Sequence, residues 1–249
     1  MTYETKNIAF LATADCQLKC RDCTAEKWKA QNKGYHLDME HLRMFLQSCR
    51  QSGYAWNQAK VSGGEPLLWH NLVIGLSAIR RSGLFSQIIL FSNGLAITPD
   101  REAYIQNVFS LCDVIRISDY GVNRPNIALA KKWKPAGAKL STPNMANFQS
   151  TANFYQPQPG AFKDVLPARC TCRALAVFGN RIYTCTASAF MEAGGAVTSE
   201  ATSTDISPGF MDRLPLDRLE EMDICGHCIS NENVRAQMED HKSQGRRVK

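Results

Sequence analysis

The sequence lacks any hydrophobic run long enough to cross a membrane. A membrane-spanning helix needs about 18 or more consecutive apolar residues, and no segment approaches that length. The apolar stretch nearest the N-terminus, residues 8–12, is also too short for the hydrophobic region of a secretion signal. We therefore expect a cytoplasmic protein with no membrane partner.

A concentrated basic region is missing as well. The chain has 29 Lys and Arg against 23 Asp and Glu, which gives a formal net charge of +6, but the basic residues are scattered. The one local run, residues 246–249, is typical of a solvated terminus. The charge pattern gives no indication of nucleic-acid binding, and we expect no nucleic-acid partner.

The composition allows one main domain and contains many cysteines. Its 249 residues, of which 44% are hydrophobic, can bury one substantial core and a small additional unit. Ten residues are Cys. A cytoplasmic compartment keeps thiols reduced, so the cysteines indicate metal or cluster ligation rather than disulfides.

The first cysteine group, Cys16, Cys20 and Cys23, has the spacing C-x3-C-x2-C. Three thiolates on one tight loop can hold three irons of a 4Fe-4S cube and leave the fourth iron open for a chelating ligand. A structural zinc site closes its shell with four ligands, so zinc explains this spacing less well. Further along the chain, residues 63–66 read Gly-Gly-Glu-Pro.

These two motifs resemble those of the radical S-adenosylmethionine (radical SAM) superfamily, which carries C-x3-C-x2-C after its first strand and a Gly-Gly-Glu segment after its second. The resemblance implies that SAM binds the open iron and is cleaved by one electron to methionine and a 5′-deoxyadenosyl radical. The residue before the third cysteine is usually aromatic in this family, whereas here it is Asp22. The positions that the resemblance implies for SAM binding are Gly63, Gly64, Glu65, Ser92, Asn93 and Ser118.

Strand-like and helical segments alternate in the first part of the chain. Apolar and β-branched runs predict strands at 6–13, 58–61, 87–91, 114–117 and 138–140, and helical periodicity predicts helices at 38–52, 70–81, 100–111 and 126–133. The alternation predicts an α/β fold with a parallel sheet, outer helices and ligands at the carboxyl ends of the strands. With the resemblance, we expect a partial (β/α) TIM-like barrel of five or six strands and a small C-terminal cluster-binding unit of a β-hairpin plus a helix.

The second cysteine group contains Cys170, Cys172, Cys185, Cys225 and Cys228. Two β-rich runs, 174–178 and 181–184, flank a Gly-Asn pair and predict a hairpin that brings the cysteines around it together. This resembles the twitch domain, a shortened SPASM domain that holds an auxiliary 4Fe-4S cluster, with a helix expected near 216–222. The resemblance implies four ligands, with Cys170 and Cys172 as alternatives for the first. A zinc ribbon built from the same thiols is the other interpretation.

The expected organisation is a barrel core at 1–143, a connector or substrate loop at 144–168, the auxiliary-cluster unit at 169–232 and a polar tail at 233–249. The connector is rich in Asn, Gln and Pro at 145–159 and has no periodicity. Cys49 and Cys112 stand apart from both groups, and we expect them to pack in the core.

Three residues near the end of the fourth predicted strand are candidates for substrate chemistry. Asp119 and Tyr120 follow the strand and could accept a proton from substrate. An Asx turn before Gly121 is the simpler explanation for Asp119. Arg116 could bind a carboxylate if the strand register turns it into the barrel.

Length and layout are similar to those of the 2-deoxy-scyllo-inosamine dehydrogenases. This implies an oxidoreductase that dehydrogenates a small-molecule substrate, a sugar or cyclitol-type metabolite, with the auxiliary cluster as electron acceptor. A flavodoxin or ferredoxin-type reductant would be its partner. A peptide-modifying maturase or epimerase is the second interpretation, and a non-catalytic zinc-binding protein is the third.

Overall fold

One sheet of eight strands organises the part of the chain that the computed structural model describes, residues 7–20, 23, 25–145, 174–194 and 202–214. Its strands are β1 (Asn7–Thr13), β2 (Trp56–Gly63), β3 (Phe85–Ser92), β4 (Val114–Ile117), β5 (Lys139–Ser141), β6 (Ala174–Phe178), β7 (Arg181–Tyr183) and β8 (Ser203–Asp205). They lie in the order β5-β4-β3-β2-β1-β6-β7-β8. The first six pair in parallel, whereas β7 and β8 are antiparallel additions at one edge. The open sheet of six parallel strands confirms the predicted partial barrel.

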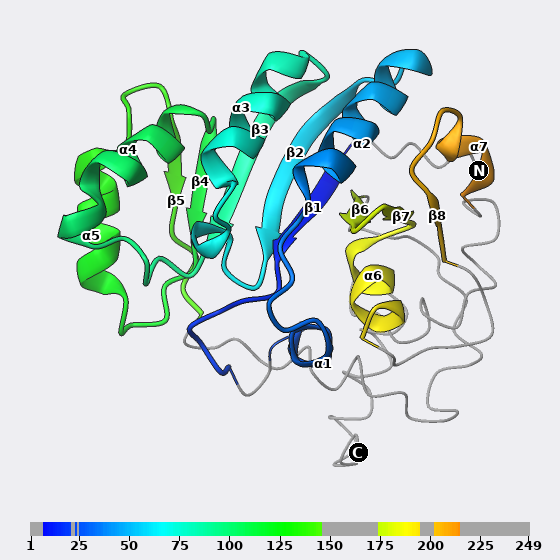
Figure 1. The fold of residues 1–249 in the computed structure, drawn as a ribbon. Helices are drawn as coiled ribbons and strands as arrows, with labels where there is room; N and C mark the ends of the chain where they lie inside the picture. The colour runs from blue at the N-terminus through cyan, green and yellow to red at the C-terminus, as the bar shows by residue number, and fades with distance from the viewer. Residues whose placement is uncertain (1–6, 21–22, 24, 146–173, 195–201, 215–249) are drawn as a thin grey trace, which may run out of the picture.

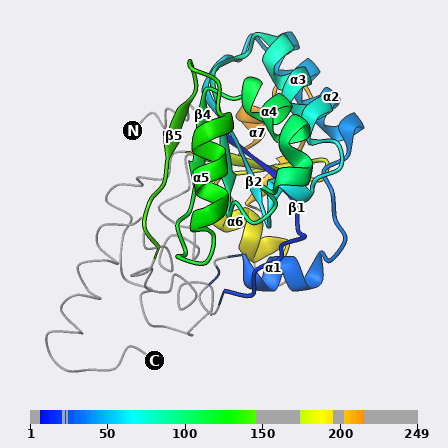
Figure 2. The ribbon, with the colours of Figure 1, turned by 90° about the vertical axis from the view of Figure 1, so that its left-hand side faces the viewer.

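The helices lie on both faces of this sheet. Their bounds are α1 (Glu26–Gln31), α2 (Met39–Gln51), α3 (Leu72–Ser82), α4 (Glu102–Ser110), α5 (Arg124–Trp133), α6 (Thr186–Glu192) and α7 (Phe210–Arg213). Helices α2 to α5 form a row along one face, while α1 and α6 lie together near β1 and β6 (Figures 1 and 2). None of the helices in the described residues is both long and apolar enough to span a membrane.

The main core fills the space between the sheet and α2 to α5. Alternate strand residues such as Phe10 point into it, and Phe10 meets Phe45 of α2 edge to face at 5.4 Å between ring centroids. Cys49 and Cys112 are buried in the same core, which confirms the packing role predicted for them. Complete burial of a large apolar side chain such as Phe10 stabilises the fold by about 1.5–3 kcal/mol.

Local sequence determines where the helices begin and end. Asp38 caps α2 by accepting a hydrogen bond from the Glu40 N–H at 2.6 Å. The predicted 70–81 helix begins at Leu72, after the N-cap Asn71, and ends at Ser82, where the C-cap Gly83 adopts a left-handed conformation. The helix predicted at 100–111 begins later, at Glu102, because Pro99–Arg101 form a separate 3-10 turn. Pro99 stands at the first position of that turn, where proline is favoured.

The C-terminal hairpin is confirmed and joins the main sheet. β6 and β7 form the predicted antiparallel pair, and β6 also pairs in parallel with β1. A second small core lies here, where Trp28 of α1 contacts Phe178 at 5.4 Å and Phe190 at 5.3 Å between ring centroids. The sequence predicted neither this pairing nor α1, α6 and β8. The helix predicted at 216–222 lies outside the described residues.

Candidate functional site

The first three cysteines lie on the loop that leaves the carboxyl end of β1. The loop is wound tightly, since the N–H of Cys23 donates to the Cys20 carbonyl oxygen at 3.2 Å and the N–H of Glu26 donates to the Cys23 carbonyl oxygen at 3.1 Å. All three thiols are partly exposed. The structure therefore places Cys16, Cys20 and Cys23 at the edge of the sheet where the sequence predicted ligands.

The electrostatics of Cys20 reflect its neighbours. Burial raises the pKa of the Cys20 thiol most, Cys23 and Cys16 raise it further, and Lys29 lowers it. Clustered thiolates repel one another until a cation sits among them, so binding a metal here would release protons.

The chemistry of the donor set suits a cluster. A structural zinc site needs four ligands around one ion, whereas a 4Fe-4S cube with an open iron needs one thiolate at each of three separate iron corners. Three cysteines spread along one loop meet that demand.

The Gly-Gly-Glu turn packs against the backbone of the cysteine loop. The N–H of Gly64 donates to the Thr13 carbonyl oxygen at 2.6 Å, and the N–H of Glu65 donates to the Asp15 carbonyl oxygen at 2.7 Å. Gly63 has a φ of +137°, and a Cβ on Gly64 would overlap the Asp15 carbonyl oxygen. The two glycines are thus required by the close approach of two backbones.

The Glu65 carboxylate is fully buried behind this turn. One oxygen accepts hydrogen bonds from the Ser92 hydroxyl at 2.7 Å and the Leu67 N–H at 3.1 Å, and the other accepts from the Asn93 N–H at 2.6 Å. Burial raises the pKa of the Glu65 carboxyl, while the donors at Asn93, Ser92 and Leu67 lower it. Glu65 therefore ties the loop after β2 to the loop after β3.

Glu65→Gln is expected to lower stability by about 1–3 kcal/mol. If the glutamine oxygen faces Ser92 and Leu67, its NH2 group faces the Asn93 N–H, so a donor opposes a donor in a buried site. Thermal unfolding followed by circular dichroism measures the loss. Glu102→Gln is the matched control, since the one hydrogen bond that Glu102 accepts from a described side chain comes from Gln106 at the surface. Equal melting temperatures for the two variants would contradict the role of Glu65.

Asn93 connects the end of β3 to the first cysteine. Its side-chain amide donates to the Cys16 sulfur at 3.6 Å and to the Gln17 side-chain oxygen at 3.4 Å. The Ser92 carbonyl oxygen in turn accepts from the Ser118 N–H at 3.0 Å. The cofactor residues predicted on three separate loops are thus brought together beside Cys16.

Asn123 is a buried part of this site that the sequence analysis missed. Its amide donates to the Asn93 carbonyl oxygen at 2.6 Å and to the Ser118 carbonyl oxygen at 2.7 Å, and its side-chain oxygen accepts from the Tyr120 N–H at 3.0 Å. The available signal was weak, because an Asn before the helical Arg-Pro pair is an ordinary N-cap choice. Asn123 fixes the loops after β3 and β4 relative to each other.

Asp119 and Tyr120 occupy different environments. Asp119 forms the expected Asx turn by accepting from the Gly121 N–H at 2.8 Å, and it contacts the Arg124 guanidinium at 3.3 Å. The Gly121 N–H and Arg124 lower the pKa of Asp119. Burial raises the pKa of Tyr120, and so do the nearby thiols of Cys20, Cys23 and Cys16. Asp119 is therefore the ionised member of the pair, whereas Tyr120, which lies nearer the cysteine loop, keeps its proton.

Arg116 lies on the sheet face opposite the main core. Ile115 and Ile117 on either side of it are fully buried, while Arg116 is exposed and its guanidinium carbon lies 5.5 Å from the centre of the Phe91 ring. The register therefore turns Arg116 toward the inside of the partial barrel.

Of the second cysteine group, only Cys185 is described. It is the N-cap of α6, where its sulfur accepts from the Ser188 N–H at 3.3 Å and the Ser188 hydroxyl interacts with the cap backbone. The hairpin thus delivers Cys185 next to the sheet. Cys170, Cys172, Cys225 and Cys228 lie outside the described residues, so their ligand roles stay predictions.

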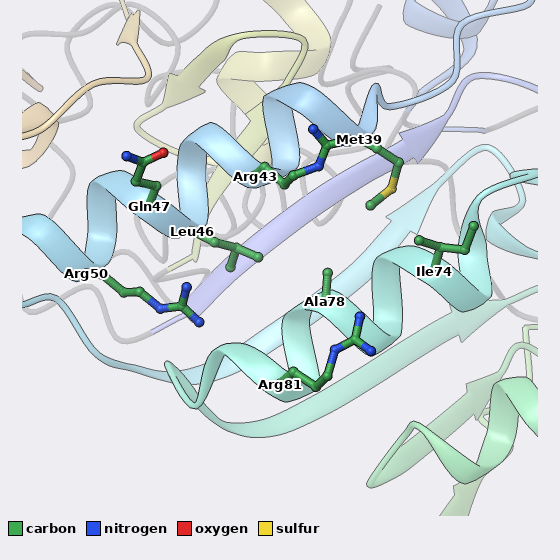
Figure 3. Close-up of a pocket in the computed structure, with 8 residues that line it drawn as sticks. All are labelled: Met39, Arg43, Leu46, Gln47, Arg50, Ile74, Ala78 and Arg81. Carbon is green, nitrogen blue, oxygen red and sulfur yellow. The ribbon is translucent and has the colours of Figure 1, made fainter.

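A pocket of about 480 Å³ lies elsewhere, between α2 and α3 (Figure 3). It is on the outer side of the helices that cover the main core, away from the loops after the strands. Its lining residues are Met39, Arg43, Leu46, Gln47, Arg50, Ile74, Ala78 and Arg81. We call this pocket the outer groove, and none of its lining residues belongs to the cysteine site.

Comparison with known proteins identifies a family and a fold. A model described as the 4Fe-4S single cluster domain matches residues 7–134, slightly more than half of the chain. No curated protein matches the sequence.

Similar solved structures include BtrN in complex with AdoMet and 2-DOIA, with a TM-score of 0.59, 15% identity and coverage of 98% of this chain and 91% of that one. SeMet BtrN in an open conformation has a TM-score of 0.58, 14% identity and coverage of 94% and 99%. Native anSMEcpe with bound AdoMet and Kp18Cys peptide has a TM-score of 0.53, 12% identity and coverage of 92% and 82%. At such identities the likeness establishes the fold.

Proposed function

The chain belongs to the 4Fe-4S single cluster domain family, and from this premise we propose that it is a radical SAM enzyme acting on a small molecule. The observation that carries the proposal is the convergence of the three-cysteine loop, the Gly-Gly-Glu turn and Asn93 at one edge of a partial barrel. When bound, a reduced cluster of this kind supplies the electron that splits SAM into methionine and a 5′-deoxyadenosyl radical.

The residues of the chain would bind and orient the reactants. Cys16, Cys20 and Cys23 would each hold one iron, and the Asn93 amide beside Cys16 would orient that ligand. Because the Glu65 carboxylate is already satisfied by three donors, its part would be to hold the loops in place. The partly exposed Gly63 and Gly64 and the side chain of Ser118 would then face SAM, and Ser92 would support them through its hydrogen bond to Glu65.

The proposed net reaction is dehydrogenation of a sugar or cyclitol-type alcohol. One hydrogen atom leaves the carbinol carbon to form 5′-deoxyadenosine, the hydroxyl proton leaves to the ionised Asp119 carboxylate, and one electron remains. Tyr120 keeps its own proton and would orient the substrate hydroxyl by a hydrogen bond. An auxiliary 4Fe-4S cluster held by Cys185, Cys225, Cys228 and either Cys170 or Cys172 would supply the acceptor for that electron. Support comes from the near full-length likeness to a BtrN structure that contains AdoMet and 2-DOIA.

Peptide modification is the second candidate function. It is favoured by the similarity to anSMEcpe, whose structure contains AdoMet and the Kp18Cys peptide. The likeness to BtrN is slightly greater in TM-score and in coverage of the related chain. A small-molecule substrate therefore remains our first proposal, and a flavodoxin or ferredoxin-type protein would be the reductant.

Anaerobic reconstitution of the full-length protein tests this function. We expect about eight irons and eight sulfides per chain, as two 4Fe-4S clusters require, and release of 5′-deoxyadenosine from SAM after reduction. Metal and sulfide analysis and chromatography of the SAM products provide the measurements. A protein that retains zinc in place of iron, or that leaves SAM intact, would instead support the zinc-binding interpretation.

A further inference from the structure

The inner face of the partial barrel can be followed strand by strand from the register. Leu11 pairs with Ser62, and Phe91 pairs with Arg116, which pairs with Ser141. Because Val61 pairs with Leu90, the residues that follow them, Ser62 and Phe91, continue one row from β1 to β5 near the carboxyl ends of the strands. The row beneath it holds Ala9, Lys60, Ile89, Val114 and Lys139. Such rows of inward side chains from neighbouring strands are the layers of a (β/α) barrel.

The charges on this face all have one sign. The six parallel strands contain three basic residues, Lys60, Arg116 and Lys139, and no Asp or Glu. All three basic residues occupy inner-face positions, since their strand neighbours Ala59, Ile115 and Leu140 pack with the main core. A cluster of like charges on one face of a sheet is unfavourable unless an anion neutralises it.

The two cations nearest the cysteine loop have no acidic partner among the described residues. The described ion pairs join other groups, such as Asp119 with Arg124 and Asp113 with Arg80. Glu65, the buried acid at this end of the barrel, is saturated by its three hydrogen-bond donors. Within the described residues, no acidic side chain competes with an entering anion for Lys60 and Arg116.

The position of Arg116 connects this face to the reaction site. The residue opposite it, Phe91, is followed by Ser92 and then by Asn93, whose amide contacts the Cys16 sulfur. The Phe91 ring lies under the guanidinium at 5.5 Å and orients it. An anionic group held in the barrel by Arg116 and Lys60 would leave the rest of a small molecule pointing toward the cysteine loop.

We propose that the substrate carries an anionic group, a phosphate or a carboxylate, which Arg116 and Lys60 bind inside the barrel. This inference rests on the proposed function and specifies its substrate class as an anionic sugar or cyclitol. Arg116 offers a planar pair of donors that suits either anion, and Lys60 adds a point charge one row deeper. The charge of the SAM carboxylate is met elsewhere, at the open iron implied by the motif.

Calorimetric titration of the reconstituted, SAM-saturated protein tests the proposal at low ionic strength. The probes are glucose 6-phosphate, glucuronate and uncharged glucose. We expect one or both anions to bind and glucose not to bind. The anion that binds with the higher affinity identifies the substrate group as a phosphate or a carboxylate. Arg116→Gln and Lys60→Met should each weaken anion binding about tenfold, the loss of one charge-assisted contact.

Arg81→Gln is the matched control, because Arg81 lines the outer groove and not the barrel (Figure 3). It should leave anion binding unchanged. The proposal would be overturned if Arg81→Gln lost anion binding while Arg116→Gln kept it. Binding of glucose as tight as that of the anions, or no anion binding by the wild type, would also overturn it. A tenfold loss of SAM affinity in Arg116→Gln would instead assign Arg116 to SAM and overturn it as well.

Two further readouts separate this inference from its premise and from a structural effect. Formation of 5′-deoxyadenosine without any probe reports on the proposed function alone, so its absence would reject the function, whereas its presence without anion binding would reject only the substrate class. Each variant removes a cation without an acidic partner in the described residues, so melting temperatures should stay within about 2 °C of wild type. A large drop would show that the cations support the fold and would overturn their role in binding.

Discussion

Joint replacement of Cys16, Cys20 and Cys23 by alanine is expected to remove about half of the iron and to abolish 5′-deoxyadenosine formation. The reason is that one loop supplies all three thiolates of the first cluster, whereas the auxiliary cluster would depend on Cys185 and cysteines farther along the chain. Iron and sulfide counts should fall from about eight to about four of each per chain. The chain should remain folded, because the three thiols are partly exposed.

Alanine replacements of Cys49 and Cys112 provide the matched control. Both thiols are buried in the main core, and burial raises the pKa of each to about 12, so they stay protonated and are poor metal ligands. These variants should lose some stability and keep the full iron content and SAM cleavage. Iron loss in the control, or SAM cleavage by the triple variant, would contradict our assignment of the first cluster.

Gly64→Ala is expected to cost about 3 kcal/mol or more and to lower the melting temperature by about 6–12 °C. The added methyl group would overlap the Asp15 carbonyl oxygen and would lie 2.7 Å from that of Ala14, so a backbone must move rather than a flexible side chain. The same movement would displace the loop of Cys16, so the iron content should fall as well. Thermal unfolding and iron analysis of one preparation measure both effects.

Gly137→Ala is the control for that experiment. A Cβ at Gly137 would meet no atom within 4 Å, and this glycine is not among those with a positive φ. Its stability should equal or slightly exceed that of the wild type, because alanine restricts the unfolded chain. If both variants behaved alike, the close approach of the Gly-Gly-Glu turn to the cysteine loop would not matter for the site.

Much of the fold follows from periodicity in the sequence. Residues 114–117 alternate Val-Ile-Arg-Ile and form β4 with the predicted bounds, and the helix predicted at 38–52 differs from α2 only by its two caps. The family match confirms a 4Fe-4S domain over the first cysteine group, and the fold is shared with BtrN, as the resemblance to the radical SAM superfamily implied. The parallel pairing of β6 with β1 was not predictable, since it joins segments more than 150 residues apart and no local pattern encodes a partner.

The site was predictable where a motif specifies it and not where contacts create it. The cysteines and the glycines were identified by spacing, and the structure brings their loops together. The sequence suggested that Glu65 faces SAM, yet its carboxylate is occupied by Ser92, Asn93 and Leu67, a fact that depends on how three loops meet. Asn123 was not predicted for the same reason. Its side-chain amide donates to backbone carbonyl oxygens of Asn93 and Ser118, which no sequence pattern indicates.

The pairing of β6 with β1 has a consequence for biosynthesis. During translation β1 emerges first but keeps an unpaired edge until residue 178 has left the ribosome. Trp28, on the helix after Cys23, meets Phe178 at that point and Phe190 twelve residues later. An unpaired apolar strand edge is a template for aggregation. The loop that receives the first cluster is therefore completed only after most of the chain has been made. Maturation of that cluster should therefore not begin before residue 190 has been made.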